Sequence, residues 1–143
     1  MSNTKYHILQ LDSLEDGVTL YVHLWPTKNA TGWVHIMHGM SEHGGRYDGL
    51  AKVLNSEGFN VSAGDHRGHG YTGKGVNTLG HLANQNGWNK VVVDQAEIIT
   101  HLQQQWSQPL TILGHSMGSF LATRVAQRYA KKLANQLQGL VLS

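Results

Sequence analysis

The sequence predicts an α/β fold in which a mostly parallel sheet carries helices on both faces. Three observations lead to this prediction. Short apolar runs alternate with segments of helical periodicity after residue 30, which is typical of β-α-β units. Two earlier strand-like runs are joined by turn residues and indicate an antiparallel hairpin. Finally, 40% of the 143 residues are hydrophobic and 14% are charged, a composition that suits one packed domain.

The hairpin comprises residues 6–11 and 18–25, which are rich in strand-forming side chains. Glu15-Asp16-Gly17 supplies the turn between them, and Pro26 ends the second strand. Alternate residues of the second strand are apolar and should share one buried face, namely Leu20, Val22 and Leu24.

The next two strands are expected at residues 32–37 and 59–63. A helix between them spans about residues 47–54 and ends with Gly58 as its C-cap. Each strand runs into a loop rich in Gly and His, at residues 38–46 and 65–70. Loops that follow parallel strands commonly carry function.

Residues 71–88 show little periodicity and are expected to be irregular. An amphipathic helix follows, and its apolar stripe consists of Val92, Ala96, Ile99, Leu102 and Trp106. Residues 110–113 form a further strand, and a helix begins near Ser119. We expect that helix to bury Phe120, Leu121, Val125 and Tyr129. Residues 138–143 read as a last apolar strand.

Between the strand at 110–113 and the helix stands Gly114-His115-Ser116-Met117-Gly118. A Gly-x-Ser-x-Gly sequence between a strand and a helix predicts a nucleophile elbow. The turn is so tight that Ser116 should have a strained backbone, and side chains at 114 and 118 would collide. The serine Oγ is then exposed at the carboxyl edge of the sheet, and the helix N-terminus favours a developing anion there.

Composition excludes several classes of function. A net charge of +2 with scattered Lys and Arg gives no reason to expect a nucleic-acid partner. The absence of cysteine excludes disulfides, a thiol nucleophile and zinc–thiolate sites. No stretch is long and apolar enough for a membrane span, so a cytoplasmic location is the expectation. A dinucleotide-binding turn is disfavoured because Gly68-His69-Gly70 lacks the third glycine and no helix is expected to open there.

Three motifs now stand in order: His38-Gly39-Met40-Ser41-Glu42-His43, Asp65-His66-Arg67-Gly68-His69-Gly70, and the pentapeptide around Ser116. Together they resemble the monoacylglycerol lipase/lysophospholipase branch of the α/β-hydrolase fold. That family has His-Gly-x-x-Glu-His followed by Arg-Tyr, which Arg46 and Tyr47 match here. The resemblance extends over nearly the whole chain and implies that a small acyl ester is the substrate, with no metal or organic cofactor.

The resemblance also implies roles for individual residues. Ser116 resembles the nucleophile, and the N–H groups of Met40 and Met117 resemble the oxyanion hole, a role that the residue after the serine and the loop after the third strand commonly fill. Five other motif residues are interpreted as structural ties between the loops: His115, Glu42, His43, Asp65 and Arg67. Ser119 stands where many family members have a second glycine.

A serine nucleophile needs a histidine and an orienting acid, which follow it in this fold. Nothing acidic follows Glu97 and no histidine follows Ser116. The fold's chain order argues against His38, His43 or His115 as the base. The resemblance therefore implies that residues 1–143 are the N-terminal portion of one α/β-hydrolase domain, truncated after about the sixth strand. The remaining strands, the cap, and the triad acid and histidine would be absent, and the chain alone inactive.

The last strand would then leave an apolar edge at Leu140-Val141-Leu142, which its own C-terminal half or another chain should cover. Transient contact with lipid surfaces is also expected. Two alternatives remain open. The same elbow would serve a peptidase or thioesterase, and a chain without an acid and a base also fits a non-catalytic interaction module.

Overall fold

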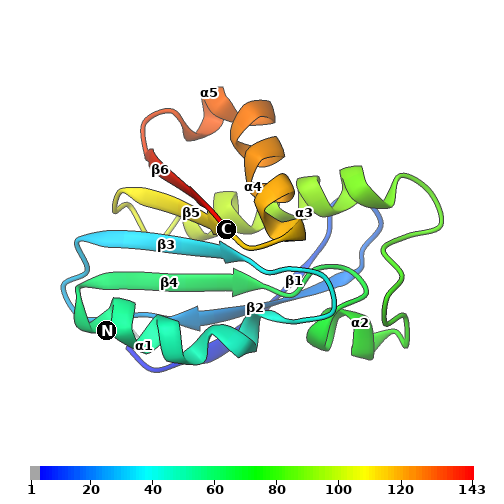
Figure 1. Ribbon diagram of the computed structural model, residues 1–143, viewed down its shortest axis with the longest axis horizontal. Coiled ribbons are helices and arrows are strands. Elements are labelled where there is room, and N and C mark those ends of the chain that lie inside the picture. Colours follow the sequence, from blue (N-terminus) through cyan, green and yellow to red (C-terminus); the bar gives the residue numbers. More distant parts are fainter. Residues whose placement is uncertain (1–3) are drawn as a thin grey trace.

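The computed structural model describes residues 4–143 as one six-stranded sheet with helices on both faces (Figure 1). The strands are β1 (His7–Asp12), β2 (Thr19–Trp25), β3 (Gly32–Met37), β4 (Phe59–Gly64), β5 (Leu110–Gly114) and β6 (Leu137–Leu142). The helices are the 3-10 turn η1 (Gly44–Tyr47) and the α-helices α1 (Asp48–Ser56), α2 (Gly70–Gly75), α3 (Gly87–Leu102), α4 (Met117–Arg128) and α5 (Ala130–Leu133).

The strand order is β1-β2-β4-β3-β5-β6. β1 pairs antiparallel with β2, which pairs antiparallel with β4, whereas β4, β3, β5 and β6 run parallel. The predicted α/β fold with an N-terminal hairpin and a mostly parallel sheet is therefore confirmed. Because β3, β4 and β5 are parallel, the loops that follow them meet at one edge of the sheet (Figure 1).

Two apolar layers cover the faces of the sheet. On one face α1 packs through Ala51 against β3 and β4, where the core contains Val34, Ile36, Val61 and Ala63. On the other face α3 and α4 cover the sheet, and the predicted hairpin stripe of Leu20, Val22 and Leu24 is buried there. Trp33 and Trp106 meet edge to face in this second layer, with ring centroids 5.6 Å apart.

A buried arginine ties the hairpin to α3. Arg67 Nε donates to Asp94 Oδ2 at 2.6 Å, and its Nη1 donates to Asp16 Oδ2 at 2.6 Å. Ser13 Oγ donates to Asp94 Oδ1 and accepts from Arg67 Nη2. Although burial opposes the charge, the two carboxylates raise the pKa of Arg67 above its usual value, so the guanidinium stays charged.

Three predictions about local structure are wrong. Residues 71–88 are not wholly irregular, because α2 opens at Gly70, where Asp65 Oδ2 accepts the Tyr71 N–H. The long helix ends at Leu102, and Trp106 is buried in the turn that follows it. Phe120 is 70% exposed, because α4 turns Leu121, Ala122 and Val125 to the sheet instead.

None of the helices within residues 4–143 has the length and apolar character needed to cross a bilayer. This finding leaves the predicted cytoplasmic location a prediction.

β6 lies at the edge of the sheet and pairs only with β5 among the described strands. Its apolar side chains are open on both faces, since Leu140, Val141 and Leu142 are each between 39% and 51% exposed. The register places Val141 beside Leu113 on the α1 face and Leu140 beside Ile112 on the α4 face. An apolar strand with a free row of N–H and C=O groups favours pairing with another strand.

We expect the isolated 143-residue chain to self-associate through this edge. Val141→Lys should raise the monomer fraction, because a charged side chain on an edge strand opposes pairing. Val53→Lys is the matched control, since Val53 is 60% exposed on α1, away from the edge. Size-exclusion chromatography with light scattering makes the comparison. A monodisperse wild-type monomer would contradict the expectation.

Candidate active site

The site lies where the loops after β3, β4 and β5 converge at the carboxyl edge of the sheet. The first loop carries Met40, the second carries His69, and the third carries Ser116. Ser116 and Met117 stand at the start of α4, so the N-terminus of a three-turn helix faces the site.

Ser116 occupies the strained corner that the sequence predicts. Its φ is +53° and its ψ is −120°, and its side chain is exposed. A Cβ on Gly118 would stand 1.9 Å from the carbonyl oxygen of Met37, and one on Gly114 would stand 2.4 Å from the carbonyl oxygen of Gly118. Gly118 is therefore required by the close approach of α4 to the end of β3, and Gly114 by the return of α4 over the end of β5, so side chains at both positions would collide as predicted.

The loop after β3 lies directly against the elbow. A Cβ on Gly39 would be 3.2 Å from the Cβ of Ser116 and 3.2 Å from the carbonyl oxygen of His115. Neither the Met40 N–H nor the Met117 N–H donates a hydrogen bond to any group within residues 4–143. The structure thus brings the three predicted site residues, Ser116, Met40 and Met117, into one place.

Glu42 fixes the shape of this loop from within. Its Oε1 accepts the Gly39 N–H at 3.0 Å and also the hydroxyl of Tyr47. Burial acts to raise the pKa of Glu42, but these hydrogen bonds outweigh it and hold the pKa below its usual value. Burial and the hydrogen bond to Glu42 raise the pKa of Tyr47. Glu42 is therefore a charged acceptor that orders the loop.

Four buried groups beneath the loop form a hydrogen-bonded chain whose tautomers are determined. His66 Nε2 lies 2.9 Å from the carbonyl oxygen of His38, so it must donate, and His66 Nδ1 then accepts from Gln95 Nε2. Gln95 Oε1 accepts from His35 Nε2 at 2.7 Å. His38 Nε2 accepts the His66 N–H, so His38 Nδ1 donates to the Gly39 carbonyl at 2.7 Å.

The far end of this chain is anchored in the core. Ser62 Oγ accepts from Trp33 Nε1 at 2.8 Å and donates its own proton to His35 Nδ1 at 2.7 Å. A proton added to His38 Nε2 or to His66 Nδ1 would set two donors against each other. Burial lowers the pKa of His35 and of His38 to about 4, and it lowers the pKa of His66 well below the ordinary value. All three rings are neutral at physiological pH.

Asp65 and Arg67, two of the five residues interpreted as structural ties, connect the loop after β4 to its neighbours. Asp65 Oδ1 accepts from His23 Nε2 at 3.0 Å and from the Gly44 N–H at 2.7 Å, which joins the first two loops. Burial acts to raise the pKa of Asp65, but these donors keep it below its usual value. Arg67 ties the second loop to the hairpin and α3.

The two histidines interpreted as structural ties, His115 and His43, are less constrained. His115 is exposed, and its Nδ1 contacts Ser143 Oγ at 3.3 Å. His43 is exposed and makes no side-chain hydrogen bond within residues 4–143, so the expected tie is absent there.

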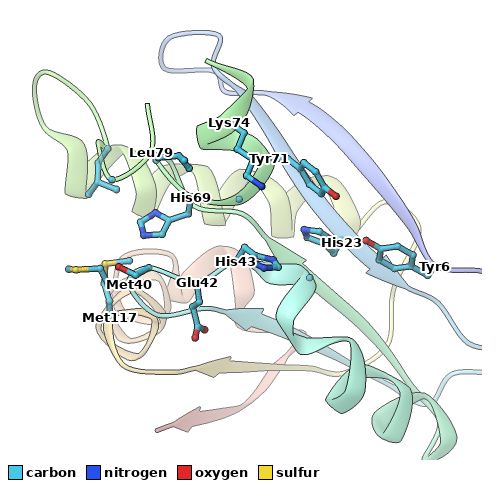
Figure 2. Close-up of a pocket in the computed structure, with 16 residues that line it drawn as sticks. Tyr6, His23, Met40, Glu42, His43, His69, Tyr71, Lys74, Leu79 and Met117 are labelled. Carbon is cyan, nitrogen blue, oxygen red and sulfur yellow. Dashed lines mark hydrogen bonds between the residues drawn. The ribbon is translucent and has the colours of Figure 1, made fainter. Parts of the chain in front are cut away.

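A cavity of about 850 Å³ opens beside the elbow (Figure 2). One part of its wall is apolar and is formed by Met40, Leu79, Leu82 and Met117. The other part carries polar groups, from Tyr6, His23, His43, Tyr71 and Lys74. His69 stands between the two parts, with its ring facing the space between Leu79 and Met40 (Figure 2). The cavity therefore suits a molecule with an apolar part and a polar part.

Sequence reasoning missed the buried chain that supports the first loop. Gln95 lies three residues after Val92 and four before Ile99, so it falls on the predicted apolar stripe of α3. His35 alternates with Val34 and Ile36 in a strand that is buried throughout. A polar residue on each of two facing apolar surfaces is the signal that could have identified the pair. Within residues 4–143 no three His, Asp or Glu side chains are grouped as a metal site.

Comparison with known proteins identifies related sequences. Residues 28–143 match the family described as serine aminopeptidase, S33. The chain is 32% identical to human monoglyceride lipase over 113 residues, which cover 78% of this chain and 35% of that protein. It is 29% identical to phospholipase YtpA of Bacillus subtilis over 120 residues, covering 83% and 42%.

Solved structures of other hydrolases have a similar fold. A carboxyl esterase of Bacillus coagulans superposes with a TM-score of 0.87 at 27% identity, over 98% of this chain and 44% of the esterase. The chain thus spans less than half the length of each of these three proteins. The α/β-hydrolase fold predicted from the motifs is confirmed by this similarity.

The elbow contact can be tested with two helical glycines. Gly118→Ala should destabilise the chain by about 3 kcal/mol, because its methyl group would collide with the end of β3. Gly49→Ala is the matched control, since a Cβ there meets nothing within 4 Å in α1. It should stabilise the chain by about 0.5–1 kcal/mol. Urea unfolding measures both, and equal effects would contradict the collision.

The neutral histidines predict a loss of stability in acid. An unfolded histidine has a pKa near 6.5, whereas folded His35 and His38 have values of about 4. Their contribution is therefore complete above pH 6.5 and is lost as the pH falls toward 4. The loss of each contribution should lower the free energy of unfolding by on the order of 2 kcal/mol by about pH 4.5.

Unfolding free energies measured from about pH 7.5 to about pH 4.5 test this expectation. His35→Phe should flatten the profile, whereas His43→Gln, at an exposed position, should leave it unchanged. A wild-type profile that stays flat below pH 6.5 would show that the rings are not held neutral.

Proposed function

The chain belongs to the serine aminopeptidase S33 family of α/β-hydrolases, and from this premise we propose that it forms the nucleophile half of a serine ester hydrolase. The proposed substrates are monoacylglycerols or lysophospholipids. The proposed intermediate is an acyl-enzyme on Ser116. The observation that carries the proposal is the positive-φ corner at Ser116 beside the N–H groups of Met40 and Met117, which have no hydrogen-bond partner in the described part of the chain.

In the proposed reaction Ser116 Oγ attacks the ester carbonyl carbon and passes its proton to a histidine. The negative charge that develops on the carbonyl oxygen is stabilised by the N–H groups of Met40 and Met117. The alcohol leaves with the proton returned by the histidine, and water then hydrolyses the acyl group and restores Ser116. This chemistry requires no metal or organic cofactor.

The histidine and its acid are proposed to come from the region that follows the matched segment in the longer relatives. The histidines beneath the first loop donate and accept bonds already and are buried, so they are not available to Ser116. On this proposal residues 1–143 are the N-terminal portion of one domain, and the rest would pair with β6 and roof the cavity. The chain alone would hydrolyse esters negligibly.

A peptidase is the second candidate, and the description of the matching family as an aminopeptidase favours it. The elbow stabilises the same tetrahedral intermediate with either substrate. The names of human monoglyceride lipase and phospholipase YtpA indicate that these relatives act on lipids. The similarity of the chain to both favours the ester substrate. Parallel assays with 1-butyrylglycerol, p-nitrophenyl butyrate and an aminoacyl amide separate the two candidates.

A fluorophosphonate probe followed by peptide mass spectrometry tests the nucleophile. We expect label on Ser116 when the chain is joined to the C-terminal region of YtpA, and a loss of at least 100-fold in rate for the 143-residue chain alone. Ser116→Ala should abolish the label. Ser119→Ala is the matched control, because Ser119 donates to the Ser116 carbonyl within α4 and should not be labelled. A chimera that unfolds cooperatively yet carries no label on Ser116 would refute the proposal.

A further inference from the structure

His69 is the one residue of the second motif whose side chain faces the cavity, and it has no part in the proposed attack by Ser116. The residue is 6% exposed, and its Nδ1 lies 2.8 Å from the carbonyl oxygen of Arg67. A carbonyl oxygen only accepts, so Nδ1 carries the proton. In the neutral ring Nε2 is then a hydrogen-bond acceptor, and it has no partner within residues 4–143.

The backbone holds this acceptor rigidly in the wall of the cavity. The His69 N–H donates to the His66 carbonyl at 2.9 Å, and the His69 carbonyl accepts from the Gly73 N–H at 2.8 Å. Gly68 and Gly70 flank it with φ of +71° and +51°. A Cβ on Gly70 would stand 2.4 Å from the Asp65 carboxylate, so the chain packs closely against Asp65 directly after His69. This packing fixes the position of the His69 backbone.

Its surroundings place the acceptor beside the elbow. The His69 and His38 ring centroids are 5.3 Å apart, and His38 supports the loop that carries Met40. Both Met40 and Met117 line the same cavity as His69. The unpaired Nε2 opens into a cavity whose nearby wall is apolar, so a ligand that fills the cavity displaces water from it. The acceptor should then discriminate between ligands that donate a hydrogen bond to it and ligands that do not.

We propose that His69 Nε2 accepts a hydrogen bond from a free hydroxyl on the alcohol part of the ester bound beside Ser116, and so selects glyceryl esters over simple alkyl esters. This inference rests on the proposed function. Saturated acyl chains of monoacylglycerols carry no donor, whereas their glycerol part carries two hydroxyls. The polar wall beyond His69 suits that glycerol part, and the wall of Met40, Leu79, Leu82 and Met117 suits the acyl chain.

Two substitutions separate the acceptor from the structural role of the ring. In His69→Asn the side-chain amide still reaches the Arg67 carbonyl but leaves no acceptor at the Nε2 position. His69→Gln places an amide oxygen near that position and should restore the acceptor. The pair thus distinguishes the loss of the hydrogen bond to the ligand from the loss of the contact to Arg67.

The first measurement needs no turnover. In the 143-residue chain carrying Ser116→Ala, the ¹⁵N resonance of His69 Nε2 is followed during titration with 1-butyrylglycerol or with propyl butyrate. We expect an upfield displacement with the glyceryl ester and none with the propyl ester. Two results would overturn the proposal: the same response to both esters, or an Nε2 that already accepts a hydrogen bond in the YtpA chimera before ligand is added.

The second measurement is the ratio of kcat/KM for 1-butyrylglycerol and propyl butyrate in the chimera. His69→Asn should lower this ratio about tenfold, with the propyl ester rate nearly unchanged, and His69→Gln should recover much of it. If His69→Asn left this ratio unchanged, or lowered kcat/KM equally for both esters, the proposed hydrogen bond from the glycerol part to His69 would be overturned. Failure of the hydrolase assignment would be seen separately, as no turnover of either ester and no probe on Ser116.

Discussion

The closeness of α4 to the end of β3 is the constraint on which the site depends. The first turn of α4 rests on the carbonyl oxygens of Met37 and His38, and only a glycine at 118 leaves room for them. The His115 N–H donates to the Met37 carbonyl at 3.1 Å, so the elbow is also hydrogen-bonded to that strand. This contact sets Ser116 against Gly39, and the two loops therefore form one unit.

The loop after β3 is held in turn by a chain of neutral groups that leads into the core. A trans peptide has its C=O and N–H on opposite sides, so a bond from His38 to the Gly39 carbonyl directs the Met40 N–H the other way. The chain continues through His66, Gln95 and His35, and each side-chain partner is satisfied. A satisfied buried network rigidifies its surroundings, whereas a partly satisfied one would be costly.

The sequence predicted the parts of the fold that local patterns determine. The strand at 32–37 follows from a short run of strand-forming residues, and the elbow from glycines whose positions are sterically required. The prediction for Phe120 is wrong because the contact of Gly118 with β3 sets the rotation of α4 about its axis, and a helical wheel does not contain that contact. The pairing of His35 with Gln95 joins residues 60 positions apart, and no pattern within either segment encodes it. Tertiary contacts of this kind decide which polar residues are tolerated in a core.

The open edge strand β6 is hydrogen-bonded to the candidate site. The Ser116 N–H donates to the Ser143 carbonyl at 2.8 Å, and the Ser143 N–H donates to the Gly114 carbonyl at 2.9 Å. The end of β6 is thus hydrogen-bonded to both sides of the elbow, and a strand that pairs with β6 in parallel would end at the same edge of the sheet as Ser116. In a parallel α/β sheet, the loop after such a strand emerges at the same carboxyl edge. Covering the apolar edge and bringing new side chains to Ser116 are therefore one event, and the free energy of the first also favours the second.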